Sequence, residues 1–242
     1  VFLFIMTALT LFLVIVNRSK MVYICLLPTI FYIIFKKRKR YILVAILICL
    51  GGYFALPNSI TDRLQYIVNY EKDPSSNLRV IFWKTGLEAF KQKPVLGWQW
   101  EDRKDFNLRY YKKIGVSEYV HENFLDRLSE WPIYYVHTHS TYLQFLLDFG
   151  IVGILFLVIF FVSTFMKAAS INFSKNKENI DSRLVALEIG TKAALAAWAI
   201  QGITDINLNN KYMIVTSVIL LFLLNYLWKE KIKLEKGQGE NE

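Results

Sequence analysis

Long apolar blocks separated by basic patches constrain this chain more than any other feature of its sequence. Of the 242 residues, 54% are hydrophobic and 20% are charged, and the two kinds are segregated along the chain. A helix rises about 1.5 Å per residue, so about 20 apolar residues cross a hydrocarbon core of about 30 Å, with about 17 as a lower limit. The pattern predicts an all-α polytopic membrane protein and largely excludes a soluble domain. The six blocks read as spans are residues 1–16, 21–35, 41–57, about 145–166, about 184–204 and 212–228.

The basic residues predict on which side of the membrane each connection lies. Residues 36–40 are five lysines and arginines in a row, and short connections of this kind stay in the cytoplasm. Alternation then gives outer connections at residues 17–20, 58–140 and 205–211, and inner segments at residues 167–183 and 229–242. Residues 58–140 hold 12 basic and 11 acidic residues, so most of the net charge of +9 lies elsewhere. The excess therefore indicates topology and anionic headgroups, and argues against nucleic-acid binding.

This topology divides the chain into four segments. Residues 1–57 and 141–228 each contain three spans, and residues 229–242 form a cytoplasmic tail. Residues 58–140 form a large extracytoplasmic helical loop, which is too long to be an idle connection. The chain starts with Val1 inside an apolar run and shows no signal peptide, so we expect it to be the C-terminal part of a longer membrane protein.

The outer loop is rich in aromatic residues and contains one well-marked helix. Its four tryptophans suit either the membrane interface or the faces of sugar rings. Residues 75–77 offer N-cap candidates for a helix over residues 78–91, which Pro94 would end. Arg79 and Trp83 are four residues apart and therefore share one side of that helix.

Two histidines stand directly before the fourth predicted span. Ser140 or Thr141 can cap a helix that starts near Tyr142, so its unpaired N–H groups would point outward beside His139 and attract an anion. Histidine acts as a base near neutral pH, and arginine binds phosphate oxygens at two points. We expect an outer site for an anionic, lipid-linked substrate. Its candidate residues are Arg18, Arg79, Trp83, His137, His139 and Asp205.

Each candidate also has a plainer interpretation. Arg79 is equally typical of a solvated arginine in the first turn of a helix, and Arg18 of a headgroup contact. A His-x-His pair binds zinc in some extended segments, but two ligands do not make a site. The outer loop lacks the clustered carboxylates that a divalent cation bridging phosphates would need, so we predict no metal and no cofactor.

Together these motifs resemble those of the O-antigen ligase and polymerase superfamily. The first stretch resembles its R-x3-W … A-F … P-x2-G pattern and consists of Arg79, Trp83, Ala89, Phe90, Pro94 and Gly97. The second resembles its H-N-x-Y-L-Q … E-x-G-x-x-G signature and consists of residues 139–144 with Asp148, Gly150 and Gly153. Asn17-Arg18-Ser19 is similar to its earlier outer S-R turn. The chain departs from the pattern at Gln99, Ser140 and Asp148, where a second Gly, Asn and Glu are usual.

The resemblance implies a metal-independent glycosyltransferase of the C-type membrane architecture, with further spans upstream. Such an enzyme moves a glycan from undecaprenyl pyrophosphate to an acceptor on the periplasmic face of the bacterial inner membrane. The acceptor is lipid A–core for a ligase and a second lipid-linked repeat unit for a polymerase. Under this hypothesis Arg79 and Arg18 hold the pyrophosphate, and His139 orients or deprotonates the acceptor hydroxyl. His137, Trp83 and Asp205 complete the substrate-binding set.

Two non-enzymatic alternatives stay open at this point. Half of a transporter would need charged or Gly/Pro-broken span centres, and here only Pro28 and Gly51-Gly52 interrupt them. A membrane sensor would explain the outer loop but not the motifs around Arg79 and His139.

Overall fold

The part of the chain that can be described is helical throughout. The computed structural model describes residues 20–55, 73–114, 137–173, 180–205 and 211–239, together with residues 9, 65 and 69. Within these ranges the regular elements are α2 (Lys20–Arg38), the 3-10 helix η1 (Lys39–Tyr41), α3 (Ile42–Ala55), α5 (Pro74–Gln92), α6 (Trp100–Ile114), α8 (Thr141–Ser170), α9 (Ser182–Gln201) and α10 (Lys211–Gly239). The predicted all-α class is confirmed for these residues. Apart from residue 9, the predicted span at 1–16 lies outside them.

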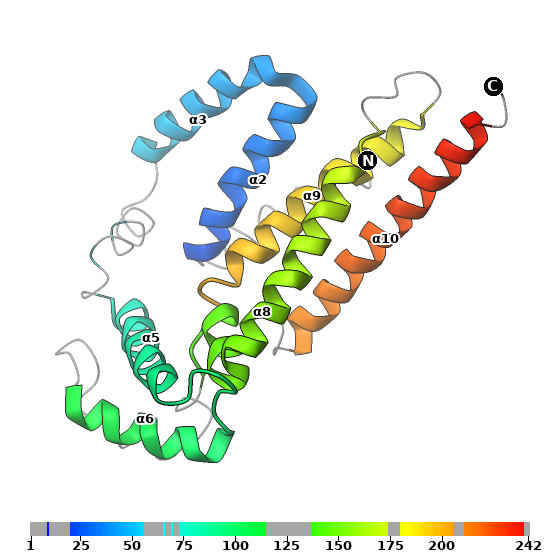
Figure 1. Ribbon diagram of the computed structural model, residues 1–242. Coiled ribbons are helices and arrows are strands. Elements are labelled where there is room, and N and C mark those ends of the chain that lie inside the picture. Colours follow the sequence, from blue (N-terminus) through cyan, green and yellow to red (C-terminus); the bar gives the residue numbers. More distant parts are fainter. Residues whose placement is uncertain are drawn as a thin grey trace.

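Three long helices, α8, α9 and α10, lie side by side and form the main body (Figure 1). Each is long and apolar enough to cross a membrane: Thr141–Ser170, Ser182–Gln201 and Met213–Lys236. Their shared core includes Leu195 and Trp198 of α9 packed with Leu220, Leu224 and Leu227 of α10. On the outside, Phe156 and Phe222 are 69% and 70% exposed, as expected for side chains that face lipid.

Helices α2 and α3 form a shorter pair at the side of α9 (Figure 1). The last turn of α2 carries three basic residues, and α3 has only 14 residues. Neither is among the described helices that are long and apolar enough to cross a membrane. The count of six spans therefore stays a prediction. The basic run explains the break between the two helices, because it continues from the end of α2 through η1.

The helices place their connections at two ends of the bundle. At one end, the amide of Thr141 at the start of α8 donates to the carbonyl of Gly202 after α9, at 2.8 Å. Met21 at the start of α2 lines one cavity with Gln201 and Met213 at that same end. At the other end, Lys36 of α2 shares a cavity with residues that close α8. The described residues Met21, Thr141, Gln201 and Met213 thus lie at one end of the bundle, and the basic run lies at the other (Figure 1).

Helices α5 and α6 lie beside the N-terminal end of α8 (Figure 1). The N-cap expected within residues 75–77 was wrong, because the Asp73 side chain accepts a hydrogen bond from the Ser76 amide at 2.9 Å. Pro74 occupies the first turn, where its fixed φ suits a helix start. The helix ends at Gln92, in agreement with the stop predicted from Pro94.

Candidate active site

A break in α8 joins this helix to the turn that follows α5. Gly150 interrupts α8 with φ 63° and ψ −155°, a conformation that is essentially restricted to glycine. The amide of Ile151 donates to the carbonyl of Pro94 at 2.8 Å, and the amide of Trp98 donates to the carbonyl of Leu147 at 2.7 Å. The backbone groups freed by the break are thus paired with residues 94–98. This contact, called the joint below, holds the end of α5 against α8.

Close backbone approach explains why both sides of this joint carry glycine. A Cβ on Gly97, whose φ is 78°, would lie 2.5 Å from the carbonyl oxygen of Leu147. A Cβ on Gly150 would collide with the carbonyl group of Val95. The two glycine motifs noted in the sequence therefore meet at a single structural feature.

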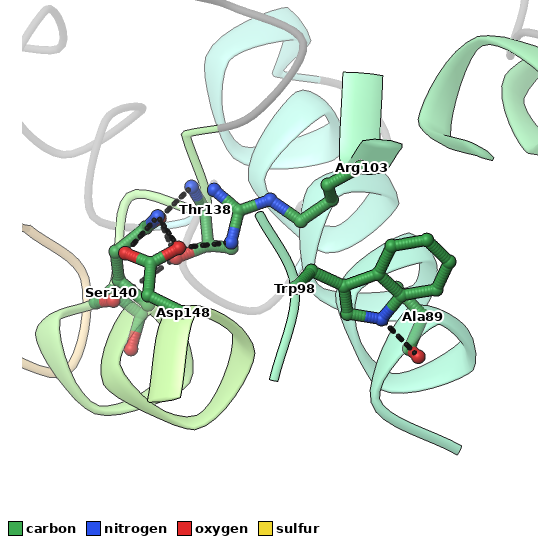
Figure 2. Close-up of polar contacts among 7 residues, drawn as sticks. Ala89, Trp98, Arg103, Thr138, Ser140 and Asp148 are labelled. Atoms are coloured by element: carbon green, nitrogen blue, oxygen red, sulfur yellow. Dashed lines mark hydrogen bonds and ion pairs between the residues drawn. The ribbon is translucent and has the colours of Figure 1, made fainter. Parts of the chain in front are cut away.

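A buried ion pair lies next to this joint (Figure 2). Arg103 of α6 is 1% exposed and pairs with Asp148 of α8. The amide group of Gln144 donates to both carboxylate oxygens of Asp148, at 3.1 and 2.9 Å. The side-chain oxygen of Gln144 in turn accepts from the backbone amide of Thr138, at 3.0 Å. This network connects α6 and α8 to the segment that carries the two histidines.

Thr138, between the two histidines, is held from a second helix as well. The indole nitrogen of Trp83 on α5 donates to its carbonyl oxygen at 2.9 Å. Its hydroxyl donates to the carbonyl of Ser140 at 3.0 Å. Next to it, His139 has a φ of 50°, which residues other than glycine seldom adopt. The fixed neighbours on both sides explain how this conformation persists.

The two imidazoles are close together and partly buried. The ring centroids of His137 and His139 are 4.6 Å apart, and Phe82 of α5 stacks on His139 at 5.9 Å. Burial, with the nearby charges of His137 and Arg79, lowers the pKa of His139 to about 4. Burial and the charge of Arg103 lower the pKa of His137. A His139 imidazole at neutral pH is therefore uncharged and can accept a proton.

Arg79 supplies a positive charge beside these rings without a carboxylate partner in the described part of the chain. Its guanidinium donates to the hydroxyl of Ser75 at 2.8 Å, and the described ion pairs do not include it. Its Nε atom and the Nδ1 atom of His137 are buried without a hydrogen-bond partner. The Nε–H group of Arg79 is a buried donor that costs free energy unless a ligand satisfies it, and a phosphate oxygen is a suitable acceptor.

The start of α8 differs from expectation in one respect. Ser140, one of the two predicted candidates, is the N-cap, and its hydroxyl accepts from the Leu143 amide at 3.4 Å. The Thr141 amide, however, donates to the carbonyls of Gly202 and Asp205, the latter at 3.0 Å. The Leu143 amide is thus used by the cap, and the Thr141 amide by the end of α9, which packs against it. These two amides are therefore not free to attract an anion, contrary to the prediction.

The remaining candidates are placed as follows. The carbonyl of Asp205 accepts from the hydroxyl of Thr141 at 2.9 Å, and the charge of its carboxylate raises the pKa of both histidines. Arg79, Trp83, His137, His139 and Asp205 thus converge at the N-terminal end of α8, from α5, from the segment before α8 and from the turn after α9. Arg18 lies outside the described residues. No group of three or more His, Cys, Asp or Glu residues within the described ranges is placed to hold a metal ion.

Comparison with known proteins identifies the family. A family model described as O-antigen ligase matches residues 2–158, which is well over half of the chain. The chain belongs to the O-antigen ligase family. No curated protein and no solved structure matches it. Family membership makes this a membrane protein of the glycosyltransferase-like O-antigen ligase and polymerase superfamily, whose members in general act on lipid-linked glycans.

The structure adds polar residues that the sequence reasoning did not name as site residues. Arg103, Gln144 and Asp148 position the histidine segment. Gln144 and Asp148 were noted only as motif residues, and Arg103 was not noted. The position of Arg103 on the buried face of α6 could have been inferred from the spacing of the residues in that helix. The buried residues of that helix, Arg103, Phe106, Asn107 and Tyr111, follow the i, i+3, i+4, i+8 pattern of one helix face.

Proposed function

We propose that this protein is an O-antigen ligase that moves a glycan from undecaprenyl pyrophosphate to lipid A–core on the periplasmic face of the bacterial inner membrane. One observation supports this proposal above the others. The guanidinium of Arg79, with no carboxylate partner among the described residues, lies beside two histidines that are held from three helices. A cation, a proton acceptor and a rigid frame are what transfer from a diphosphate needs.

The reaction is a displacement at the anomeric carbon of the donor sugar. The oxygen of the acceptor hydroxyl forms a new bond to this carbon, and the bond from the carbon to the pyrophosphate oxygen breaks. The electron pair leaves with the pyrophosphate, whose added negative charge Arg79 stabilises, together with Arg18 under the sequence-based hypothesis. The hydroxyl proton passes to His139, which returns it to solvent.

The low pKa of His139 fits this order of events. An imidazole with a pKa of about 4 is uncharged before substrate binds, so it accepts a hydrogen bond from the acceptor hydroxyl. It is a weak base in that state. A bound pyrophosphate offsets the charge of Arg79 and raises the pKa of His139, because an anion favours the protonated imidazole. His139 therefore becomes a stronger base only when the donor is present.

Complementation of an O-antigen-deficient host tests the two central residues. We expect Arg79→Ala to slow glycan transfer about 10–150-fold, since a charge-assisted hydrogen bond contributes about 1.5–3 kcal/mol. We expect His139→Ala to slow transfer about 10²–10⁴-fold, the usual contribution of a general base. Lys84→Ala is the control, because Lys84 is an exposed cation on the same helix. Unimpaired transfer by both site variants would remove the mechanism.

The polymerase reaction uses the same donor, so the acceptor decides between the two activities. Mass analysis of surface glycolipid in a deletion strain separates them. Accumulation of free lipid-linked polymer supports the ligase. Single repeat units on the core would instead assign the protein to polymerases of the same superfamily. Neither half of a transporter nor a sensor accounts for the convergence of Arg79 and His139.

A further inference from the structure

A second cavity lies between α2, α8 and α9, away from the histidines. It has a volume of about 560 Å³. Its walls are largely apolar and include Pro28 of α2, Phe165 of α8, and Ala196 and Ile200 of α9. Ile200 is eight residues beyond Lys192 on α9, so the apolar wall extends over about 12 Å of that helix.

One end of this cavity is polar and positively charged. It is lined by Tyr32 and Lys36 of α2, Asn172 after α8 and Lys192 of α9. The ammonium of Lys36 lies 5.9 Å from the ring centre of Tyr32. Lys36 is the first residue of the basic run that continues through Arg40. A cavity with an apolar length and a cationic end matches a molecule with a hydrocarbon chain and an anionic head.

The second lysine is held in place by a buried carboxylate. Lys192 donates to Glu188 at 2.6 Å and to the carbonyl of Ile171 at 2.5 Å. Glu188 is 4% exposed and also accepts from the amide of Phe173 at 2.8 Å. An ammonium has three donors, so Lys192 keeps one beyond these two bonds. Glu188 balances its charge, and Lys36 supplies the net positive charge of the cavity.

We propose that this cavity binds an anionic glycerophospholipid, with the phosphate between Lys36 and Lys192 and one acyl chain along the wall formed by Pro28 and Ala196. Basic pockets between helices on the cytoplasmic side of membranes bind anionic headgroups in this way. The charged end of the cavity, at Lys36, lies at the end of the bundle opposite Thr141 and the histidine pair, so the bound headgroup is distinct from that of the glycan donor. It fills a gap between three helices and thereby stabilises their packing.

Lipid retention tests the proposal directly. The protein is placed in nanodiscs that contain equal amounts of phosphatidylglycerol and phosphatidylcholine with identical acyl chains, and the lipids that remain bound are counted by native mass spectrometry. We expect phosphatidylglycerol to be retained about fivefold over phosphatidylcholine. This ratio corresponds to about 1 kcal/mol for one lysine near a membrane surface.

Two pairs of variants separate the charged end from the apolar wall. Lys36→Gln should remove the preference for phosphatidylglycerol, whereas Lys37→Gln, an equal change at an exposed neighbour outside the cavity, should keep it. Ala196→Phe should reduce retention of both lipids, because the larger side chain would occupy the apolar part of the cavity. Ala186→Phe, at an exposed position of α9 outside the cavity, should not.

Three results would overturn the proposal. The first is equal retention of the two lipids by the unaltered protein. The second is an equal loss of the preference for phosphatidylglycerol in Lys36→Gln and Lys37→Gln. The third is undiminished retention of both lipids by Ala196→Phe. The first would mean that the cavity does not select charge, and the others that the lipid binds elsewhere. Lys36 is exposed, so its replacement leaves the buried contacts of the fold intact.

Discussion

The side chain of His139 sits in surroundings that favour its neutral form. Phe82 covers one face of the ring, and the positive group of Arg79 is close by. The sequence predicted that Arg79 would lie near His139 in one site, but nothing in its motifs indicated that the rings would be partly buried. Burial depends on the packing of α5 against α8, which is a tertiary property.

At this scale, the first prediction concerns the titration of His139. Its pKa in the free protein should be about 4, below the ordinary value of 6.5, and should rise when pyrophosphate is added. NMR of histidine-labelled protein measures both values, and the chain has only three histidines to assign. Because the unfolded chain binds the proton near pH 6.5, this residue should also lower stability as the pH falls from 6.5 toward 4. A pKa near 6.5 that pyrophosphate leaves unchanged would contradict the assignment.

The second residue-level prediction concerns the buried pair of Arg103 and Asp148. Asp148→Asn leaves a buried guanidinium without its carboxylate, so we expect a loss of about 3 kcal/mol in the free energy of unfolding. Asp102→Asn is the matched control, since Asp102 pairs with Lys93 at the surface and should cost at most about 1 kcal/mol. Thermal melting in detergent compares the two variants. Equal effects would show that the buried pair does not hold the site together.

At the scale of elements, the start of α8 and the end of α5 were predicted accurately. Ser140 is the cap of α8, and Pro94 follows the end of α5, because both signals act through local backbone geometry. The start of α5 was misplaced since Asp73 and Pro74 compete successfully with the later cap candidates. The break at Gly150 was not predicted. It depends on residues 94–98, more than 50 positions earlier in the chain.

The third prediction tests that break. Gly150→Ala should lower the melting temperature, because its φ of 63° costs about 1–3 kcal/mol for a residue with a side chain, and the added Cβ meets Val95. Gly190→Ala, within α9, places a Cβ in open space and should stabilise by about 0.5–1 kcal/mol. Opposite signs for the two glycine replacements are the expected result. A neutral Gly150→Ala would mean that α8 runs straight at this position.

For the whole molecule, the alternation of hydrophobic and basic segments predicts a topology, and the side of the membrane on which each connection lies stays a prediction. The number of membrane-crossing helices was harder to predict, because α2 and α3 are short and one of them ends in a run of cations. Hydropathy measures composition, and it does not show whether a short apolar helix crosses the bilayer or lies against its neighbours.

The fourth prediction is the sidedness of the two ends. In a background with Cys25 and Cys49 replaced by alanine, Asp105→Cys should react with an impermeant thiol reagent in intact spheroplasts. Arg38→Cys should react only after permeabilisation, because the basic run stays in the cytoplasm. Both positions are exposed, so access to reagent reports the side of the membrane. The reverse pattern would place the histidines in the cytoplasm.

The joint at Gly150 also bears on how the protein is made. Residues 94–98 leave the ribosome before residue 150, so the carbonyls that receive the amides of Ile151 and Val152 already exist when α8 is synthesised. A helix opened near its beginning would otherwise expose bare peptide groups to hydrocarbon. We therefore expect insertion of α8 to depend on residues 94–98, so that a defect in this turn appears as failed insertion as well as lost activity.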